Sequence, residues 1–393
     1  MANPLSKHWT LDPDFTFLNH GSFGACPKVV LEAQAGLRAH LEAEPVRFFM
    51  RELEEALDHA RHALATFVKA DPEGMVFVRN ATEGVNTVLA RYPLKPGDAL
   101  LTTDHAYAAC KNALDDLAER TGAEVIVAKV PFPIKGAYQV VEAIEAAVTP
   151  RVKLALLDHI TSPTGLVFPI PEIVQKLEGH GIACLVDGAH APGMIDLDVN
   201  AIGASYYTGN CHKWLCAPKG AAFLWARADK RATLRPLSIS HGANSTRTDR
   251  SKLRLEFDFT GTHDPTAHLC VPVAIDAIAA MVPGGWPAVR AHNHALVIAG
   301  RDMIIAGIGG EAPAPDEMLG SLATIMLPDA KPGDEPGKFI FQPLGDRLYH
   351  QHKIEVPVIS WPHPPRRQVR IAAQLYNDLA GYGRLRDALV SGL

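Results

Sequence analysis

The chain of 393 residues is long enough for two domains, or for one large domain with a smaller appendage, since domains commonly contain about 100 to 200 residues. Its composition, 47% hydrophobic and 21% charged, is typical of a globular protein and excludes collagen, coiled coil and disorder. Lys and Arg total 38 and Asp and Glu total 43, so the net charge of −5 provides no field that attracts a polyanion, and nucleic acid is excluded as an expected partner.

The N-terminal residues contain no basic segment followed by an apolar stretch, so we predict no signal peptide. No run of about 18 apolar residues without charges indicates a membrane helix, and we expect a cytoplasmic protein that does not bind a membrane. The six cysteines are scattered along the chain, which is typical of free thiols in a reducing compartment. Cys211 and Cys216 are close in sequence, but no second pair completes a zinc site, so no metal is expected.

Short apolar runs alternate with longer segments of helical period, which predicts an α/β domain with a mostly parallel sheet flanked by helices. Seven strands are expected at residues 75–78, 99–103, 124–130, 152–157, 183–186, 204–208 and 221–225. Helices are expected at residues 29–42, 53–68, 83–90, 108–120, 140–148 and 170–179.

A long apolar helix is predicted from residue 267 to 281, and the Pro-Gly-Gly sequence at 283–285 ends it. We place a domain boundary there: an N-terminal segment covers 1–19, a large domain 20–283 and a small C-terminal α+β domain 284–393. In the small domain we expect a loop rich in Pro and Gly at 329–337, a strand at 354–360 and a last helix from about residue 364.

Two chemically active side chains follow predicted strands. Asp187 ends the strand at 183–186, and His190 stands three residues later. Ligands bind at the carboxyl ends of strands in open α/β sheets, although an Asp before Gly is also a common turn residue. Lys213 stands between His212 and Trp214 after the strand at 204–208. A lysine is usually a solvated surface charge, but a desolvated one is a suitable amine for a Schiff base.

These residues together indicate a site for pyridoxal 5'-phosphate, which needs an amine for covalent attachment and a carboxylate beside its pyridine nitrogen. The phosphate needs a cradle, and residues 80–84 provide one because a strand ends there and a helix begins. Backbone N–H groups and the Thr82 hydroxyl are its candidate donors, while the same segment taken alone is an ordinary helix cap.

The chain also resembles the class V aminotransferases, which are fold-type I pyridoxal phosphate enzymes, and within them it is most similar to isopenicillin N epimerase-like proteins. The resemblance rests on an ordered set of motifs at residues 19–24, 44–49, 80–83, 104–107, 162–165, 187–190, 210–214, 261–264 and 369–377. It covers nearly the whole chain and implies the fold-type I architecture.

The resemblance implies that Lys213 binds the cofactor as a Schiff base, that Asp187 pairs with the pyridinium and that His190 binds the phenolic oxygen. Further cofactor contacts are implied for Ala81, Thr82, Ser162, Asn210 and His212. Thr262 matches a threonine that related enzymes contribute from the neighbouring subunit, which implies a homodimer with shared active sites.

The resemblance also implies which residues contact the substrate and cover the cofactor ring. His105 and Tyr107 are both candidates for covering the ring. Arg370 matches the arginine that binds the substrate α-carboxylate, whereas an alternative reading makes it a surface residue of a terminal helix. The pocket wall is expected to include Asn19, His20, Phe48, Phe49 and His263.

We therefore predict an epimerase or racemase acting on an amino acid or on a small molecule containing one. Lys213 is expected to be the base, and Tyr107 or His105 the acid on the opposite face. The alternatives are a C–S lyase acting on a cysteine derivative, an aminotransferase, and a binding protein that keeps the fold without activity. The chain has no cysteine after Cys270, so sulfur transfer through a C-terminal persulfide is not expected.

Overall fold

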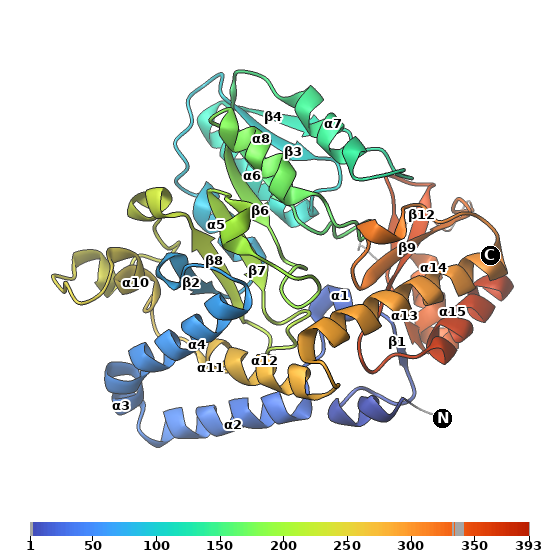
Figure 1. Cartoon of the computed structure of the whole chain (residues 1–393), viewed down its shortest axis with the longest axis horizontal. Coiled ribbons are helices and arrows are strands. Elements are labelled where there is room, and N and C mark those ends of the chain that lie inside the picture. The colour runs from blue at the N-terminus through green and yellow to red at the C-terminus, as the bar shows by residue number, and fades with distance from the viewer. Residues whose placement is uncertain (1–2, 332–333, 335–341, 393) are drawn as a thin grey trace.

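The computed structural model describes residues 3–331, 334 and 342–392. Its main feature is a seven-stranded sheet in the order β2-β8-β7-β6-β5-β3-β4 (Figure 1). The strands are β2 (Met75–Val78), β3 (Ala99–Thr103), β4 (Glu124–Ala128), β5 (Val152–Asp158), β6 (Ala183–Asp187), β7 (Tyr206–Asn210) and β8 (Ala222–Ala226). β8 runs antiparallel to both of its neighbours, β2 and β7, and the other adjacent pairs of this sheet are parallel. The predicted seven-stranded, mostly parallel sheet is therefore confirmed.

Helices cover both faces of this sheet, so its central strands β6 and β7 are buried on both sides. One face packs against α5 (Ala81–Leu89) and α6 (Ala108–Thr121). The other packs against α4 (Leu53–Phe67), α7 (Tyr138–Ala147), α8 (Ile170–Gly179) and α12 (Val271–Ala280). Successive side chains of β6 point to opposite faces of the sheet. Leu185 packs in the core on the side of α5 and α6, and Val186 packs in the core on the other side.

The predicted helix at 267–281 is two helices, α11 (Thr266–Leu269) and α12, because Pro272 in the first turn of α12 has no N–H to continue the preceding helix. After Gly284, α13 (Gly285–Ile308) crosses toward the second sheet, as Figure 1 shows. In the part of the chain that the structure describes, no single helix is long and apolar enough to cross a membrane. The bent pair formed by Thr266–Ala280 and Gly285–Ile308 is together long and apolar enough, by length and composition only.

The second sheet has three antiparallel strands in the order β11-β12-β9, packed against helices of the C-terminal part. Its elements are β9 (Leu322–Leu327), α14 (Pro343–His352), β11 (Val358–Ser360), β12 (Arg367–Ala372) and α15 (Leu379–Gly392). The expected strand at 354–360 is divided at Pro357 into β10 (Ile354–Glu355) and β11. The expected helix from residue 364 is wrong, because β12 is the fully buried central strand and α15 begins at Leu379. The predicted loop at 329–337 lies largely outside the described residues.

The N-terminal residues join this second sheet region. β1 (Thr16–Phe17) pairs in parallel with β10, and the backbone N–H of Ala372 donates to the carbonyl of Leu18. The chain then forms α1 (His20–Phe23), α2 (Lys28–Ala43), α3 (Pro45–Arg47), the π-helical turn Phe48–Glu52 and α4. The remaining short helices are α9 (Val199–Ile202), α10 (Lys252–Phe257) and the 3₁₀ turns Pro4–His8, Pro72–Gly74, Ala228–Thr233, His241–Asn244 and Asp316–Met318. The predicted domain division itself stays a prediction.

Candidate active site

A cavity of about 470 Å³ opens at the carboxyl ends of β5, β6 and β7. Each of these strands ends in a polar residue that lines it, namely Asp158, Asp187 and Asn210. Nine of the predicted site residues line this cavity: Ala81, Thr82, Tyr107, Ser162, Asp187, His190, Asn210, His212 and Lys213. Parallel strands bring their carboxyl ends to one edge of the sheet, so residues far apart in sequence meet here.

Lys213 is enclosed at the base of the cavity. Its Nζ lies 3.2 Å from His190 Nε2. Burial, together with the nearby Arg370 guanidinium, lowers the pKa of Lys213 from 10.5 to about 8. An amine with this pKa loses its proton near neutral pH much more readily than an ordinary lysine does, and the uncharged amine is the form that reacts as a nucleophile or a base.

His190 is held between Lys213 and an indole ring. Its Nδ1 accepts a hydrogen bond from Trp214 Nε1 at 3.3 Å. Burial and the positive charges of Lys213 and Arg370 hold the pKa of His190 well below its ordinary value of 6.5, so the ring is neutral.

Asp187 has a neighbouring carboxyl group, Asp158, directly opposite it in the register of β5 and β6. Asp187 accepts hydrogen bonds from the Ala189 N–H at 2.9 Å and from Cys110 Sγ at 3.1 Å, whereas Asp158 accepts the Tyr107 N–H at 3.3 Å. Burial and the charge of Asp187 raise the pKa of Asp158 well above its ordinary value. Burial raises the pKa of Asp187 as well, but its hydrogen bonds from Cys110 and Ala189 and the charge of Lys213 oppose that rise. Asp187 is therefore the carboxyl of this pair that more readily carries the negative charge, and Asp158 is the one that more readily holds a proton.

The N-terminus of α5 forms one wall of the cavity. Asn80 caps this helix by accepting the Glu83 N–H at 2.8 Å. Asn210 Oδ1 accepts the Ala81 N–H at 2.8 Å, which ties α5 to the end of β7. A Cβ at Gly84 would lie 2.1 Å from Thr208 Oγ1, so glycine lets α5 approach the sheet this closely. The positive end of the helix dipole is thus directed at the cavity, which favours an anion.

Arg370 lies on β12 and is 4% exposed, so the surface reading of this residue is wrong. Its Nη1 donates to the carbonyl and to the hydroxyl of Ser162, the latter at 3.1 Å, and its Nη2 donates to Ser22 Oγ at 3.4 Å. Both serines line the cavity. Burial lowers the pKa of Arg370 to about 10, so it stays cationic at neutral pH, and its buried Nε has no hydrogen-bond partner.

Comparison with known proteins identifies the family. Residues 18–309 match the family model of the class V aminotransferases. The chain belongs to this family. It is 33% identical to an isopenicillin N epimerase from Streptomyces clavuligerus, over 96% of this chain and 95% of that protein. It is 30% identical to a probable chloroplastic L-cysteine desulfhydrase from Arabidopsis thaliana, over 96% of this chain and 83% of that protein.

Solved structures share the fold over nearly the whole chain. The cystine C–S lyase C-DES, in complex with its product cysteine persulfide, matches with a TM-score of 0.78 and 21% identity, over 96% of this chain and 98% of that chain. A cysteine desulfurase from Escherichia coli matches with a TM-score of 0.78 and 19% identity, over 98% of this chain and 96% of that chain. The expected fold-type I architecture is confirmed.

As a class V aminotransferase family member, the protein takes pyridoxal 5'-phosphate as its cofactor, and the donor set of the cavity fits this group. Asp187 offers a carboxylate for the pyridinium, and Lys213 offers an amine of lowered pKa. The N-terminus of α5 suits the phosphate, with Thr82 beside it. Asn210 uses its oxygen on Ala81 and has its amide nitrogen left to reach an anion.

The two candidates for covering the cofactor ring are separated by the structure. Tyr107 lines the cavity and is 44% exposed. His105 is fully buried outside the cavity wall, with Nδ1 2.8 Å from Thr164 Oγ1, Nε2 3.2 Å from the Val130 carbonyl and its ring packed edge-on against Trp361. The geometry therefore favours Tyr107.

Asn19, His20 and Arg370 are not among the residues that line the cavity, so their contacts with the substrate stay predictions. Asn19 Nδ2 donates to Glu355 Oε1 at 2.8 Å. His20 Nε2 donates to the Lys213 carbonyl at 3.0 Å, and its Nδ1 lies 2.8 Å from the Tyr376 hydroxyl. The contact of His20 thus holds the backbone at Lys213, while Asn19 is tied to the start of the C-terminal sheet region through Glu355.

Thr262 and His263 line a different cavity of about 220 Å³. Arg79 lines both this cavity and the one that holds Lys213.

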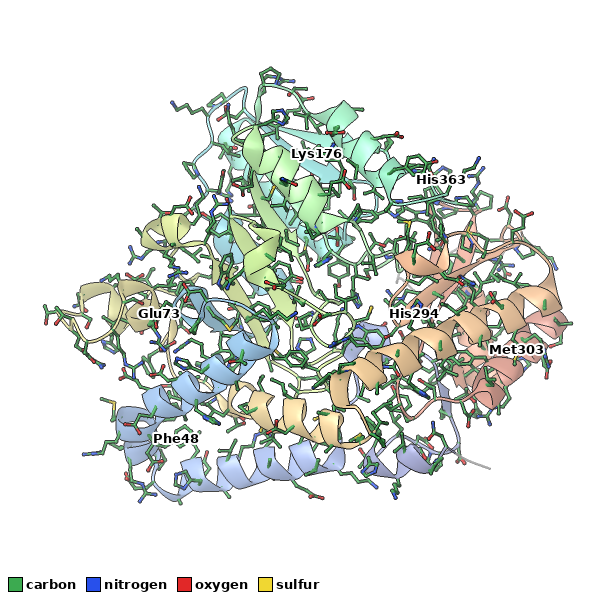
Figure 2. The ribbon with its side chains drawn as sticks, in the orientation of Figure 1. Phe48, Glu73, Lys176, His294, Met303 and His363 are labelled. Carbon is green, nitrogen blue, oxygen red and sulfur yellow. The ribbon has the colours of Figure 1, made fainter. Side chains whose placement is uncertain are left out.

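Figure 2 shows Phe48 at the bend between α2 and α4. There Phe48 packs with Leu41 and Leu53, so it is part of a local core of its own chain, outside the first cavity.

Sequence reasoning missed two residues of the site, Asp158 and Cys110. Asp158 follows an apolar strand just as Asp187 does, so the same pattern contains the signal. Cys110 lies in the first turn of α6 and reaches Asp187 across the sheet, which no local pattern indicates. Among the described residues no group of three or more His, Cys, Asp or Glu could hold a metal ion.

Proposed function

We propose that the protein is an epimerase or racemase that inverts the α-carbon of an amino acid or of a small molecule containing one. The observation that carries this proposal is the presence of a proton acceptor and a proton donor in one cavity. Lys213 has a pKa of about 8, and burial raises the pKa of Tyr107, which keeps its hydroxyl protonated. Near full-length similarity to isopenicillin N epimerase supports the assignment.

Each residue has a stated task in this proposal. When bound, pyridoxal 5'-phosphate draws electron density away from Cα and so acidifies its hydrogen. Arg370 binds the substrate α-carboxylate through its planar fork of donors. Lys213 Nζ accepts the Cα proton, and Tyr107 Oη donates a proton to the opposite face. A well-placed acid or base contributes about 10²- to 10⁴-fold to the rate.

A C–S lyase acting on a cysteine derivative is the second candidate, because L-cysteine desulfhydrases are as similar to this chain as the epimerases are. The same Lys213 would begin either reaction. No cysteine stands among the described residues that line the cavity, and the nearby Cys110 thiol donates to Asp187 with its pKa raised by burial. A lyase of this kind would release its sulfur product directly.

The experiment that tests the function is incubation of cofactor-loaded enzyme in deuterium oxide with isopenicillin N, L-amino acids and cysteine S-conjugates. Chiral chromatography with mass detection reads the products. Inversion with deuterium at Cα and the amine retained establishes the epimerase. Keto acid, ammonia and free thiol without inverted product establish the lyase, and accumulation of the amine form of the cofactor establishes an aminotransferase.

Tyr107→Phe tests the proton donor. We expect inversion to fall by about 100-fold or more, since a positioned acid is removed. Exchange of the Cα hydrogen with solvent deuterium should continue with retention of configuration, because Lys213 remains. Tyr138→Phe, at a tyrosine that is 54% exposed, is the matched control. Undiminished inversion in Tyr107→Phe would refute the assignment.

We also propose that the enzyme is a homodimer in which Thr262 serves the partner's site. This is supported by the place of Thr262 outside the cavity that holds Lys213 in the same chain. Lys213→Ala and Thr262→Ala proteins, each impaired alone, should regain activity when unfolded and refolded together, since one site of the mixed dimer is then intact. If Thr262 served its own chain, both sites of that dimer would stay impaired and mixing would restore nothing.

A further inference from the structure

Three nitrogen-bearing side chains form a row that leads from the buried Trp214 to His190 and Lys213, which line the cavity. Trp214 Nε1 donates to His190 Nδ1 at 3.3 Å, and His190 Nε2 lies 3.2 Å from Lys213 Nζ. Trp214 and His190 are 1% and 2% exposed, so water does not compete for these groups. Indole nitrogen is a donor only, which fixes the direction of the first bond.

That direction determines where His190 carries its proton. A ring nitrogen that accepts a hydrogen bond holds no proton, so Nδ1 is bare and the single proton of the neutral ring is on Nε2. Nε2–H therefore points at Lys213 Nζ. An ammonium group has three donors and no acceptor, so this contact is favourable only when Nζ is an uncharged amine with a free lone pair.

We propose that Trp214 is a positioning residue that fixes the proton of His190 on Nε2 and thereby disfavours the ammonium form of Lys213 in the protein without its cofactor. Protonation of Lys213 would require His190 to move its proton to Nδ1, and the hydrogen bond from Trp214 would then be lost. Trp214 thus disfavours the charged form of Lys213 through His190, without a hydrogen bond of its own to Lys213.

The surroundings keep Trp214 in its place. Its ring packs against His20, with ring centroids 4.8 Å apart, and His20 also donates to the Lys213 carbonyl. Gly193 has a φ of +90°, and a Cβ there would lie 2.7 Å from the Trp214 backbone. His20 therefore holds the peptide before Trp214, and Gly193 packs against the peptide after it.

Three other groups act on the charge of Lys213 from the elements packed around it. Arg370 on β12 lowers its pKa, while Asp187 on β6 and Cys110 on α6 raise it. A substitution at Trp214 leaves all three in place, so its effect is separable from theirs. The inference rests on the proposed role of Lys213 as the cofactor-binding amine, but its tests use no substrate.

Trp214→Phe removes the N–H and keeps an aromatic ring. The matched control is Trp286→Phe, which removes the buried hydrogen bond from Trp286 Nε1 to the Ile275 carbonyl at 3.0 Å. Competitive acetylation of the full chain freed of cofactor, with acetic anhydride over a pH series and mass spectrometry of the Lys213 peptide, reports the pKa of this amine. We expect a rise of about 0.5 to 1 unit in Trp214→Phe, the equivalent of one neutral hydrogen bond, and none in Trp286→Phe.

An unchanged value in Trp214→Phe, or an equal shift in Trp286→Phe, would overturn the proposal. A second measurement uses the unaltered protein and does not depend on the variant folding. Spectra of the ¹⁵N-histidine-labelled protein, with His190 assigned from a His190→Gln sample, should show a bare Nδ1 and a protonated Nε2. The opposite tautomer would be decisive against it, and a failed epimerase assay would change neither result.

Discussion

Replacing Lys213 with methionine should stabilise the cofactor-free protein, because an enclosed ammonium is exchanged for an apolar chain of similar length. Burial lowers the pKa of Lys213 from 10.5 to about 8. This difference in the pKa of Lys213 between the unfolded and the folded chain corresponds to a loss of roughly 3 kcal/mol in the free energy of unfolding, at about 1.4 kcal/mol per pKa unit. Below about pH 8 the amine is charged in both states, so the folded protein bears this whole penalty.

The pH dependence distinguishes this effect from better packing by methionine. Between about pH 8 and 10.5 the unfolded chain binds a proton at Lys213 that the folded chain does not, so the stability of the natural protein rises with pH through this interval. The advantage of Lys213→Met should therefore be largest at pH 7 and should shrink toward pH 10.5.

Thermal unfolding of the two cofactor-free proteins at pH 7, 8.5 and 10 measures this prediction. Lys95→Met, at an exposed lysine, is the control and should change the unfolding midpoint little at every pH. If Lys213→Met gave no gain at pH 7, the amine would not be penalised by burial as the structure implies. A gain that stayed constant with pH would point to packing alone.

Four further substitutions test other parts of the site. Asp187→Asn should weaken cofactor binding about tenfold or more in a spectrophotometric titration, since a charge-assisted hydrogen bond is lost. Asp158→Asn should change cofactor binding by less than about threefold, because the raised pKa of Asp158 favours its protonated form. Arg370→Lys should raise KM about tenfold with a smaller change in kcat, because lysine lacks the fork that grips a carboxylate. Gly84→Ala should lower the midpoint of thermal unfolding, with a loss of about 2 kcal/mol or more, since its Cβ would overlap Thr208.

The large sheet and the cofactor residues were predictable because their signals are local. Asp187 and Lys213 each follow an apolar run, and a run of this kind bounded by turn residues indicates a strand wherever it pairs. The end of β5 carries the same signal, so Asp158 could have been found by applying the rule to every strand of the sheet.

The part around Arg370 could not be predicted, because its polar residues are buried by partners distant in sequence. β12 contains Arg367, Gln368 and Arg370, which a local pattern assigns to an exposed helix. Arg367 donates to Asp334, and Gln368 donates to the Pro163 carbonyl. Only the assembled structure shows which polar partners let these side chains be buried.

The pairing of the N-terminal strand also sets a constraint on the order in which the enzyme can mature on the ribosome. β1 pairs with β10, Leu18 accepts from Ala372, and Asn3 donates to the carbonyls of Leu375 and Asn377, so residues 3–18 find their partners only after residues 354–377 have been made. The seven strands of the large sheet emerge earlier and have every neighbour they require. His20, which holds the Lys213 carbonyl, also contacts the Tyr376 hydroxyl, so a nascent chain cannot complete this support of Lys213 before residue 376 has left the ribosome.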